Sequence, residues 1–255
     1  MSKSSFVECV IPYRTEYALW QEHINRYVFA LRFVPNKVVL DVACGTGYGA
    51  GLMGKTAELV IGVDISREAL TYAKRHYGKQ RNIEFVLSDA HTLPFRDKVF
   101  DSVVSFETIE HLIQYKDFLK EIMCILKMGG KLIISTPNRQ IISSSSQEKP
   151  PNPFHVKEFD AEEFSQLLSI FFTNLQFYGQ CYYTMKDWLF RVLDEHLPSF
   201  RIIFKKFNKI IFKPPMPQIK MTKTIDPVYR VKKFRNLYPV LTPRFFIVVA
   251  TNEKR

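Results

Sequence analysis

Short apolar runs alternate with stretches of helical periodicity over most of the chain. Strands are predicted at 37–42, 58–64, 82–88, 100–106, 131–136, 173–183 and 245–251, with helices at 16–33, 66–77, 108–126 and 160–171. Ser66 is a predicted helix N-cap, and Asp160 with Glu163 has the spacing of a capping box. Strands that alternate with helices need parallel crossovers. The pattern therefore predicts an α/β, doubly wound, Rossmann-like sheet.

Length and charge refine this picture. The chain has 255 residues, which fits a single domain, 1–255, and its formal net charge is +11. Residues 182–244 hold 14 Lys and Arg against 4 Asp and Glu, so most of the net charge lies there. We therefore expect a basic, aromatic-rich insertion at about 183–243, between the last two strands, with an anionic partner.

Three interpretations of the insertion remain open. Its apolar residues at 200–211 have helical spacing and basic neighbours, which is typical of a helix at an anionic membrane surface. The same spacing fits a cap whose apolar face closes an acceptor pocket. Nucleic acid ranks last, because no RNA- or DNA-binding motif accompanies the basic residues.

The sequence also bears on the compartment. The N-terminal residues lack the apolar core of a signal peptide, and the four cysteines form no CxxC pair. The uncharged stretch 164–185 contains many amide and hydroxyl groups, so we expect a helix end and a strand there. These features predict a cytoplasmic protein, with peripheral contact at the inner membrane face as an option.

A glycine-rich turn follows the first predicted strand. Asp41 lies at the end of that strand, and Gly45, Gly47 and Gly49 follow it. Such glycines let the backbone approach a ligand at a helix N-terminus, and 45–50 also fits a GxGxxA dinucleotide fingerprint. Asp64 ends the next strand, where a carboxylate can accept from both hydroxyls of a ribose. The turn and Asp64 together predict an adenosine-type ligand.

Two further carboxylates distinguish the candidate ligands. Asp41 would be repelled by a pyrophosphate but suits a cationic amino group. Asp89, followed by Ala90 after the third strand, can accept from an adenine amino group. A nicotinamide dehydrogenase would give neither Asp41 nor Asp89 a role, which disfavours that class.

The ordered set of these features, with PFRDKVFDSVVSFETIEHL and LKMGGKLIISTPN, resembles the class I S-adenosylmethionine-dependent methyltransferases over about 27–183 and the last strand. That resemblance implies a seven-stranded sheet with an antiparallel last strand. It also implies a cofactor site: Asp41, Gly45 and Gly47 at the methionine part, Asp64 at the ribose, Ile65 on the adenine, Asp89 and Ala90 at the adenine edge, and Phe106 near the methionine end.

Several strings, among them HINRYVFALRFV, ISTPN and NPFHVKEF, resemble a bacterial subgroup linked to polysaccharide biosynthesis. This resemblance implies O-methylation of a glycan-like or small-molecule acceptor. A non-enzymatic alternative is a module that binds the cofactor without catalysis, but the intact glycine and acid positions argue against it.

Glu107, Glu110 and His111 form an ExxEH string after the fourth strand, and on one helix they would share a face. With His155 they could hold Mg²⁺ or Mn²⁺. The string resembles the metal-ligating motif of small-RNA 3′-end methyltransferases and of some quinone O-methyltransferases. Alternatively, the string supports packing beneath the cofactor, and His111 or His155 acts as a general base.

Overall fold

The computed structural model describes residues 10–12, 15–142, 150, 152–182, 231–233 and 243–253. The strands are β1 (Val38–Val42), β2 (Leu59–Asp64), β3 (Ile83–Leu87), β4 (Phe100–Phe106), β5 (Leu126–Pro137), β6 (Thr173–Tyr182), β7 (Lys232–Lys233) and β8 (Pro243–Thr251). The helices are α1 (Tyr17–Ala30), α2 (Tyr48–Met53), α3 (Arg67–Tyr77), η1 (Ile109–His111), α4 (Tyr115–Ile125), α5 (Arg139–Ile142) and α6 (Ala161–Phe171), of which η1 is a 3₁₀ turn.

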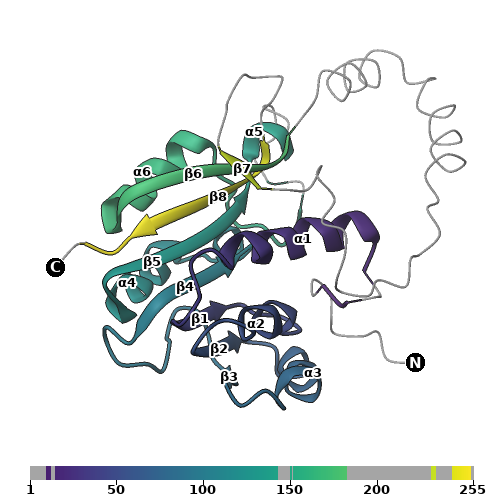
Figure 1. Cartoon of the computed structure of the whole chain (residues 1–255). Helices are drawn as coiled ribbons and strands as arrows, with labels where there is room; N and C mark the ends of the chain where they lie inside the picture. Colours follow the sequence, from purple (N-terminus) through teal and green to yellow (C-terminus); the bar gives the residue numbers. More distant parts are fainter. Residues whose placement is uncertain are drawn as a thin grey trace, which may run out of the picture.

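All of these strands belong to one sheet in the order β3-β2-β1-β4-β5-β8-β6-β7 (Figure 1). Strands β1 to β5 pair in parallel, whereas β8 lies antiparallel to both β5 and β6. The two-residue β7 only extends the outer edge of β6. The predicted doubly wound sheet with its antiparallel last strand is therefore confirmed.

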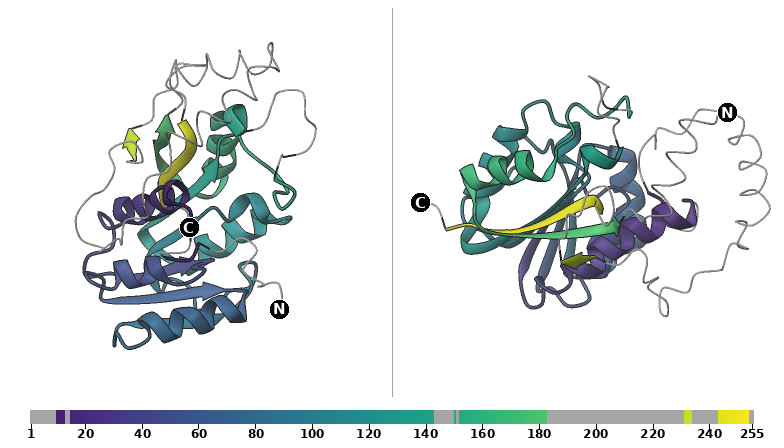
Figure 2. Two further views of the ribbon diagram at one scale, coloured as in Figure 1. Left: turned by 90° about the vertical axis from the view of Figure 1, so that its right-hand side faces the viewer. Right: turned by 90° about the horizontal axis from the view of Figure 1, so that it is seen from above.

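Helices cover both faces of the sheet and bury two apolar clusters. One cluster joins α1, α2 and α3 to one face, through side chains such as Val39, Val104 and Ile133. The other joins α4 and α6 to the opposite face, through the alternate residues Leu40 and Val103. Figure 2 shows α1 and α6 on opposite sides of β6 and β8. Because successive strand residues point to opposite faces, strands such as β1, β4 and β5 supply both clusters.

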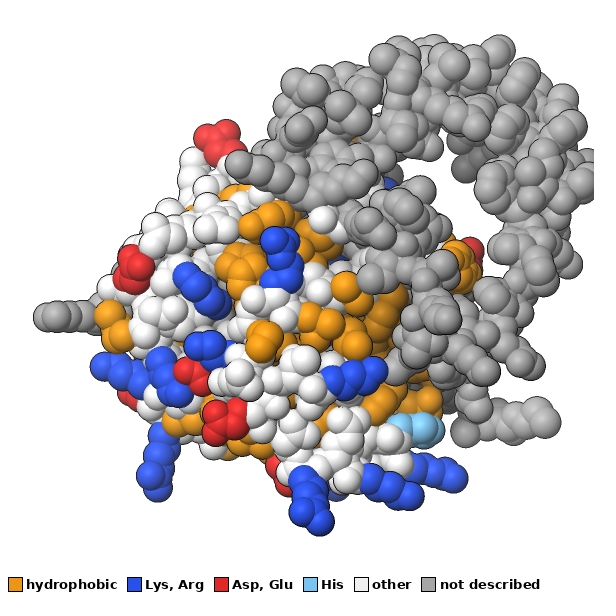
Figure 3. Space-filling view, in the orientation of Figure 1, with side chains coloured by type: hydrophobic (Ala, Val, Ile, Leu, Met, Phe, Trp, Pro, Cys, Tyr) orange, Lys and Arg blue, Asp and Glu red, His pale blue; other side chains and the backbone are white. Residues whose placement is uncertain are grey.

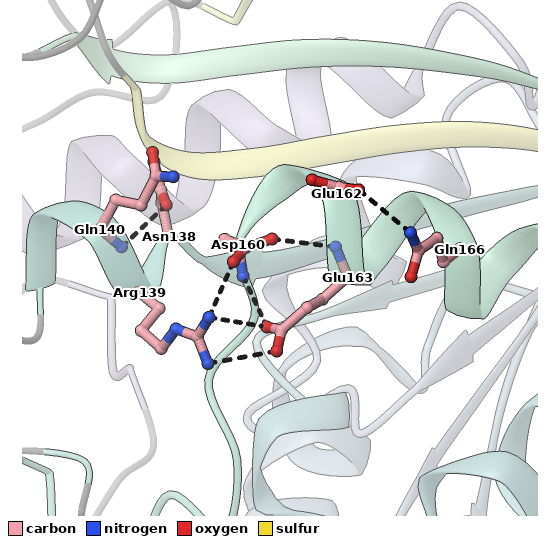
Figure 4. Close-up of polar contacts among 7 residues, drawn as sticks. All are labelled: Asn138, Arg139, Gln140, Asp160, Glu162, Glu163 and Gln166. Carbon is pink, nitrogen blue, oxygen red and sulfur yellow. Dashed lines mark hydrogen bonds and ion pairs between the residues drawn. The ribbon is translucent and has the colours of Figure 1, made fainter. Parts of the chain in front are cut away.

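Local capping fixes where two helices begin. The Ser66 hydroxyl accepts a hydrogen bond from the Ala69 backbone N–H at the start of α3. Asp160 and Glu163 form the predicted capping box at the start of α6. Arg139, at the start of α5, forms ion pairs with both of these carboxylates (Figure 4). The chain after β5 is thereby tied to α6 on one side of the sheet.

The predicted continuous helix over 108–126 is wrong. The structure has the single turn η1 and then α4, which starts at Tyr115. The Glu110 carbonyl accepts from the backbone N–H groups of Val156 and Lys157, at 2.7 and 3.2 Å, instead of a helical partner four residues later. Helix α4 ends at Ile125, and β5 begins at the next residue and continues through Gly129 and Gly130.

The predicted insertion cannot be compared directly with the structure, since 183–230 and 234–242, including the amphipathic pattern at 200–211, lie outside the described residues. The uncharged stretch up to Tyr182 forms the end of α6 and strand β6, as expected. In the part of the chain that the structure describes, no helix is both long and apolar enough to span a bilayer. Figure 3 shows one face of this part, on which Lys and Arg side chains are dispersed among polar and acidic groups.

Candidate active site

Three carboxylates lie at the carboxyl ends of neighbouring parallel strands. Asp41 is near the end of β1, Asp64 ends β2, and Asp89 follows β3 by two residues. The order β3-β2-β1 places the three strand ends side by side. This edge of a doubly wound sheet, beside the switch of strand order between β1 and β4, is where such folds bind ligands.

Asp41 is fully buried, and only one of its oxygens has a hydrogen-bond partner among the described residues. The Tyr27 hydroxyl donates to Asp41 Oδ1 at 3.0 Å, while Oδ2 has no such partner. Burial raises the pKa of Asp41 to about 8; the Tyr27 hydrogen bond opposes this rise and the charge of Asp64 adds to it. A cationic group placed at Oδ2 would stabilise the ionised carboxylate.

Asp64 holds the glycine turn in place. Its two oxygens accept from the backbone N–H groups of Gly45 and Ser66, both at 2.8 Å. The same carboxylate therefore fixes the turn after β1 and the start of α3. A ribose hydroxyl would share these oxygens, since each carboxylate oxygen can accept more than one hydrogen bond.

The glycines of the turn have different surroundings. Gly45 and Gly47 both have positive φ, at 55° and 76°. A Cβ at Gly45 would meet no protein atom within 4 Å, whereas at Gly47 it would lie 2.6 Å from Ala73 Cβ. A Cβ at Gly49 would lie 2.1 Å from the ring of Tyr27. Gly45 thus leaves room for a ligand, and Gly47 and Gly49 are needed for packing between helices.

The other expected cofactor residues flank the same edge. The Ile65 side chain is 73% exposed directly after Asp64, which leaves it available to pack on a flat ring. Ala90 packs against the second cluster, and Phe106 is buried with its ring edge-on to Tyr27, 5.0 Å between centroids. Asp89 accepts from the backbone N–H and the ring of His91, which lowers its pKa.

A second polar group lies at the ends of β4 and β5. Glu107 follows β4 with a φ of 51°, and its carboxylate accepts from the Ser135 hydroxyl at 2.7 Å. Glu110 is fully buried; its Oε2 accepts from Thr136 at 3.3 Å, and its Oε1 has no hydrogen-bond partner among the described residues. Burial, with the nearby Glu107, raises the pKa of Glu110 well above its ordinary value.

The structure brings Glu110, His111 and His155 together, with candidate ligand atoms all within 4.8 Å of one another. Ring nitrogen Nδ1 of His155 lies 2.7 Å from Glu158, and that of His111 lies 3.1 Å from the carbonyl of Phe154. With Nδ1 as the donor in each ring, the lone pair is on Nε2, as in histidines that bind metals. Glu107 is not part of this group.

Helix α1 contributes buried polar residues that the sequence analysis did not single out, and one of them, Arg26, acts electrostatically on Glu110. Arg26 is fully buried and donates to the Gln180 side chain, and Glu22 is buried one helical turn before it. Tyr27 links the same helix to Asp41. The sequence contained a signal for Glu22 and Arg26. Both are charged residues on the apolar face of a predicted amphipathic helix, where charged residues are rare.

The comparison with known proteins covers the part of the chain that carries these strand ends. Residues 40–134, from β1 into β5, match the family model of a methyltransferase domain. A Mycobacterium tuberculosis protein named "Probable S-adenosylmethionine-dependent methyltransferase" is 38% identical over 130 residues, covering 51% of this chain and 46% of its own.

A second relative is also named as a methyltransferase. The ubiquinone biosynthesis O-methyltransferase of Coxiella burnetii is 33% identical over 115 residues, which is 45% of this chain and 49% of that protein. The chain spans about half the length of the curated relatives it matches. Both relatives are named as methyltransferases, which agrees with the family model matched by residues 40–134.

Solved structures share this fold. A Thermotoga maritima S-adenosylmethionine-dependent methyltransferase, named as a possible histamine N-methyltransferase, superposes with a TM-score of 0.58 at 20% identity, covering 92% of this chain and 94% of its own. The YcgJ protein of Bacillus subtilis gives 0.58 at 16% identity, covering 91% and 100%. At these identities the likeness concerns the fold.

Proposed function

We propose that the protein transfers a methyl group from S-adenosylmethionine to an oxygen of a glycan-like or small-molecule acceptor. The observation that carries the cofactor assignment is the buried Asp41, whose Oδ2 has no hydrogen-bond partner among the described residues. Asp41 would hold the amino group of the methionine part, beside the open side of Gly45. Asp64 would hold the ribose, and Ile65, Asp89 and Ala90 would surround the adenine.

The acceptor would bind over the ends of β4 and β5, next to Phe106. The cofactor carboxylates lie on the β1-β2-β3 half of the edge, and the group around Glu110 lies on the other half. A methyl group delivered near Phe106 would therefore meet an acceptor held on that second half. The named M. tuberculosis relative specifies no acceptor, and the strings that resemble the polysaccharide-linked subgroup support a glycan hydroxyl.

Glu110, His111 and His155 would hold a divalent cation such as Mg²⁺ or Mn²⁺ for this reaction. These three side chains fit a divalent cation. Glu110 Oε1 is buried without a hydrogen-bond partner in the described part of the chain. In both histidine rings a contact at Nδ1 fixes the orientation and leaves Nε2 for the metal. Such an ion would act as a Lewis acid and lower the pKa of an acceptor hydroxyl.

This arrangement favours, as a second candidate function, metal-dependent O-methylation of a quinone or an RNA 3′ end. Without a metal, His111 or His155 would be the general base.

Cofactor affinity should depend on pH through Asp41. Because the pKa of Asp41 is about 8 and a cationic amino group needs its ionised form, binding should release a proton below that pH. We expect affinity for S-adenosylhomocysteine to rise as the pH is raised towards 8, by up to about tenfold per unit. Calorimetry in buffers of different ionisation enthalpy measures the protons released and tests the proposed function.

The matched variant is Asp41→Asn, which keeps the shape of the side chain and removes its charge. It should bind S-adenosylhomocysteine weakly and with little dependence on pH over the same range. Asp97→Asn makes the same change at an exposed position and should behave as the wild type. Wild-type binding without proton release, or no binding of S-adenosylhomocysteine at all, would contradict the assignment.

The two glycines should respond differently to alanine. Gly47→Ala combines a positive φ with a clash against Ala73 and Phe85, so we expect about 2–4 kcal/mol of lost stability. Gly45→Ala should cost only about 1–2 kcal/mol for its φ. It should nevertheless weaken S-adenosylhomocysteine binding, because the new methyl group enters ligand space. Urea unfolding and calorimetry on both variants separate the effects; equal losses of stability would count against this distinction.

A further inference from the structure

Arg26 is a buried charged residue, and two of its three guanidinium nitrogens have no hydrogen-bond partner among the described residues. Its side chain has no exposed surface, and an arginine keeps its charge even when buried. Its Nη1 donates to Gln180 Oε1 at 2.9 Å. Neither Nε nor Nη2 has a hydrogen-bond partner among the described residues. In a guanidinium group these two nitrogens present parallel N–H donors along one edge, the geometry that binds two oxygens of one carboxylate or phosphate.

The surroundings hold this edge in a fixed orientation. The guanidinium carbon lies 4.8 Å from the centre of the Phe245 ring, and Gln180 in turn donates to the Glu22 carbonyl at 2.9 Å. The nearest acid on the same helix, Glu22, is instead paired with Arg244 at 3.2 Å. No ion pair joins Arg26 to a carboxylate in the described part of the chain. Its charge is therefore not compensated by a direct partner there.

The position of Arg26 in the fold indicates which ligand it faces. Phe245 pairs with Pro137 at the carboxyl end of β5 and with Gln180 of β6. Arg26 also acts electrostatically on Glu110, which lies after β4. It therefore belongs to the β4-β5 half of the edge, away from Asp64 and Asp89. Tyr27, the next residue of α1, reaches Asp41 from the same helix.

We propose that the Nε–Nη2 edge of Arg26 binds an oxyanion, a carboxylate or a phosphate, of a ligand held over the ends of β4 and β5. The inference rests on the proposed function and narrows it, since it gives the acceptor an anionic group in addition to its methylated oxygen. The carboxylate of the cofactor's methionine part has the same chemistry and is the other possible source. In either case the burial of Arg26 strengthens the pairing, because the surrounding dielectric is low.

The first experiment titrates methyl phosphate and acetate into the full chain saturated with S-adenosylhomocysteine, followed by calorimetry. We expect saturable binding of at least one anion to the wild type. Arg26→Lys keeps the charge but loses the two-donor edge, and it should weaken that binding at least about tenfold. Arg32→Lys is the matched control, because Arg32 also lies over a phenylalanine ring but is exposed. It should leave binding unchanged.

The second experiment distinguishes the two sources of the oxyanion. Affinities for S-adenosylhomocysteine and for methylthioadenosine, which lacks the amino acid part, are compared in wild type and Arg26→Lys. A loss confined to S-adenosylhomocysteine assigns the cofactor carboxylate to Arg26. Unchanged nucleoside affinities with weakened anion binding assign the acceptor.

Gln180→Glu, which places a carboxylate beside Nη1, replaces Arg26→Lys if that variant does not fold, and it should weaken anion binding in the same way. The inference is overturned if the wild type binds neither anion and its preference for S-adenosylhomocysteine over methylthioadenosine is unchanged in the variant that folds. A wild type that binds no S-adenosylhomocysteine contradicts the proposed function instead. The anions can then still be titrated into the chain alone.

Discussion

Asp64→Ala should weaken the binding of S-adenosylhomocysteine by about 2–4 kcal/mol, because each hydrogen bond to a charged acceptor contributes about 1.5–3 kcal/mol with some compensation. In the wild type, Asp64 also accepts from the backbone of Gly45 and Ser66, so the variant loosens the turn that shapes the site. Both effects act in the same direction on affinity. Calorimetry at fixed pH measures the change directly.

The control for this prediction is Asp64→Asn. An amide oxygen can still accept one backbone hydrogen bond, so the turn should be kept in part while the charge is lost. We expect an affinity between those of the wild type and Asp64→Ala. Thermal unfolding of each variant shows how much of the loss comes from the turn. Unchanged affinity in Asp64→Ala would remove Asp64 from the cofactor site.

Substitutions in and around the group of Glu110, His111 and His155 should also have a large effect, on the affinity for a divalent metal ion. Mn²⁺ titrated into the full chain, followed by electron paramagnetic resonance, should show one site that requires Glu110, His111 and His155. Glu158→Gln alters only the partner that orients His155, and should lower Mn²⁺ affinity about 10–100-fold. His155→Gln removes a ligand and should lower the affinity further. This order of effects follows from direct and indirect roles at one ion.

Two observations decide this prediction. His91→Gln is the control, because His91 contacts Asp89 on the other half of the edge, away from the group around Glu110. It should leave Mn²⁺ binding unchanged. If neither Mn²⁺ nor Mg²⁺ binds the wild type at millimolar concentration, the metal assignment fails. His111 or His155 then remains as a candidate general base, with chelators expected to have no effect on methyl transfer.

Much of the proposed cofactor side could be predicted from the sequence, because it depends on the order of strands and loops along the chain. Asp41, Asp64 and Asp89 each lie at or just past a strand end, and parallel strands bring such positions to one edge. The apolar runs that define those strands are short and well separated by helical patterns. The strands and the positions of the three acids at their ends therefore follow from periodicity, whereas the antiparallel last strand is implied only by the family resemblance.

The proposed acceptor side depends on contacts between distant segments, which a single sequence does not reveal. Arg26 donates to Gln180, which is 154 residues away in the sequence. The backbone N–H of Val156 donates to the Glu110 carbonyl, which would accept from a residue four positions later in a continuous helix. Helix propensity favoured such a helix, and the tertiary hydrogen bond from Val156 overrode it. The strained backbone at Glu107, at a φ of 51°, likewise has no signal in its residue type.

The contact between Gly49 and Tyr27 restricts which substitutions these two positions can accept during evolution. Any side chain at position 49 would overlap the Tyr27 ring, and a smaller ring-free residue at position 27 would give up the hydroxyl that holds Asp41. A side chain at position 49 therefore requires a smaller residue at position 27, and that change gives up the hydrogen bond to Asp41. Among homologues that keep Asp41, a residue larger than glycine at position 49 should occur only with a smaller residue at position 27. A library randomised at both positions should recover mainly the parental pair.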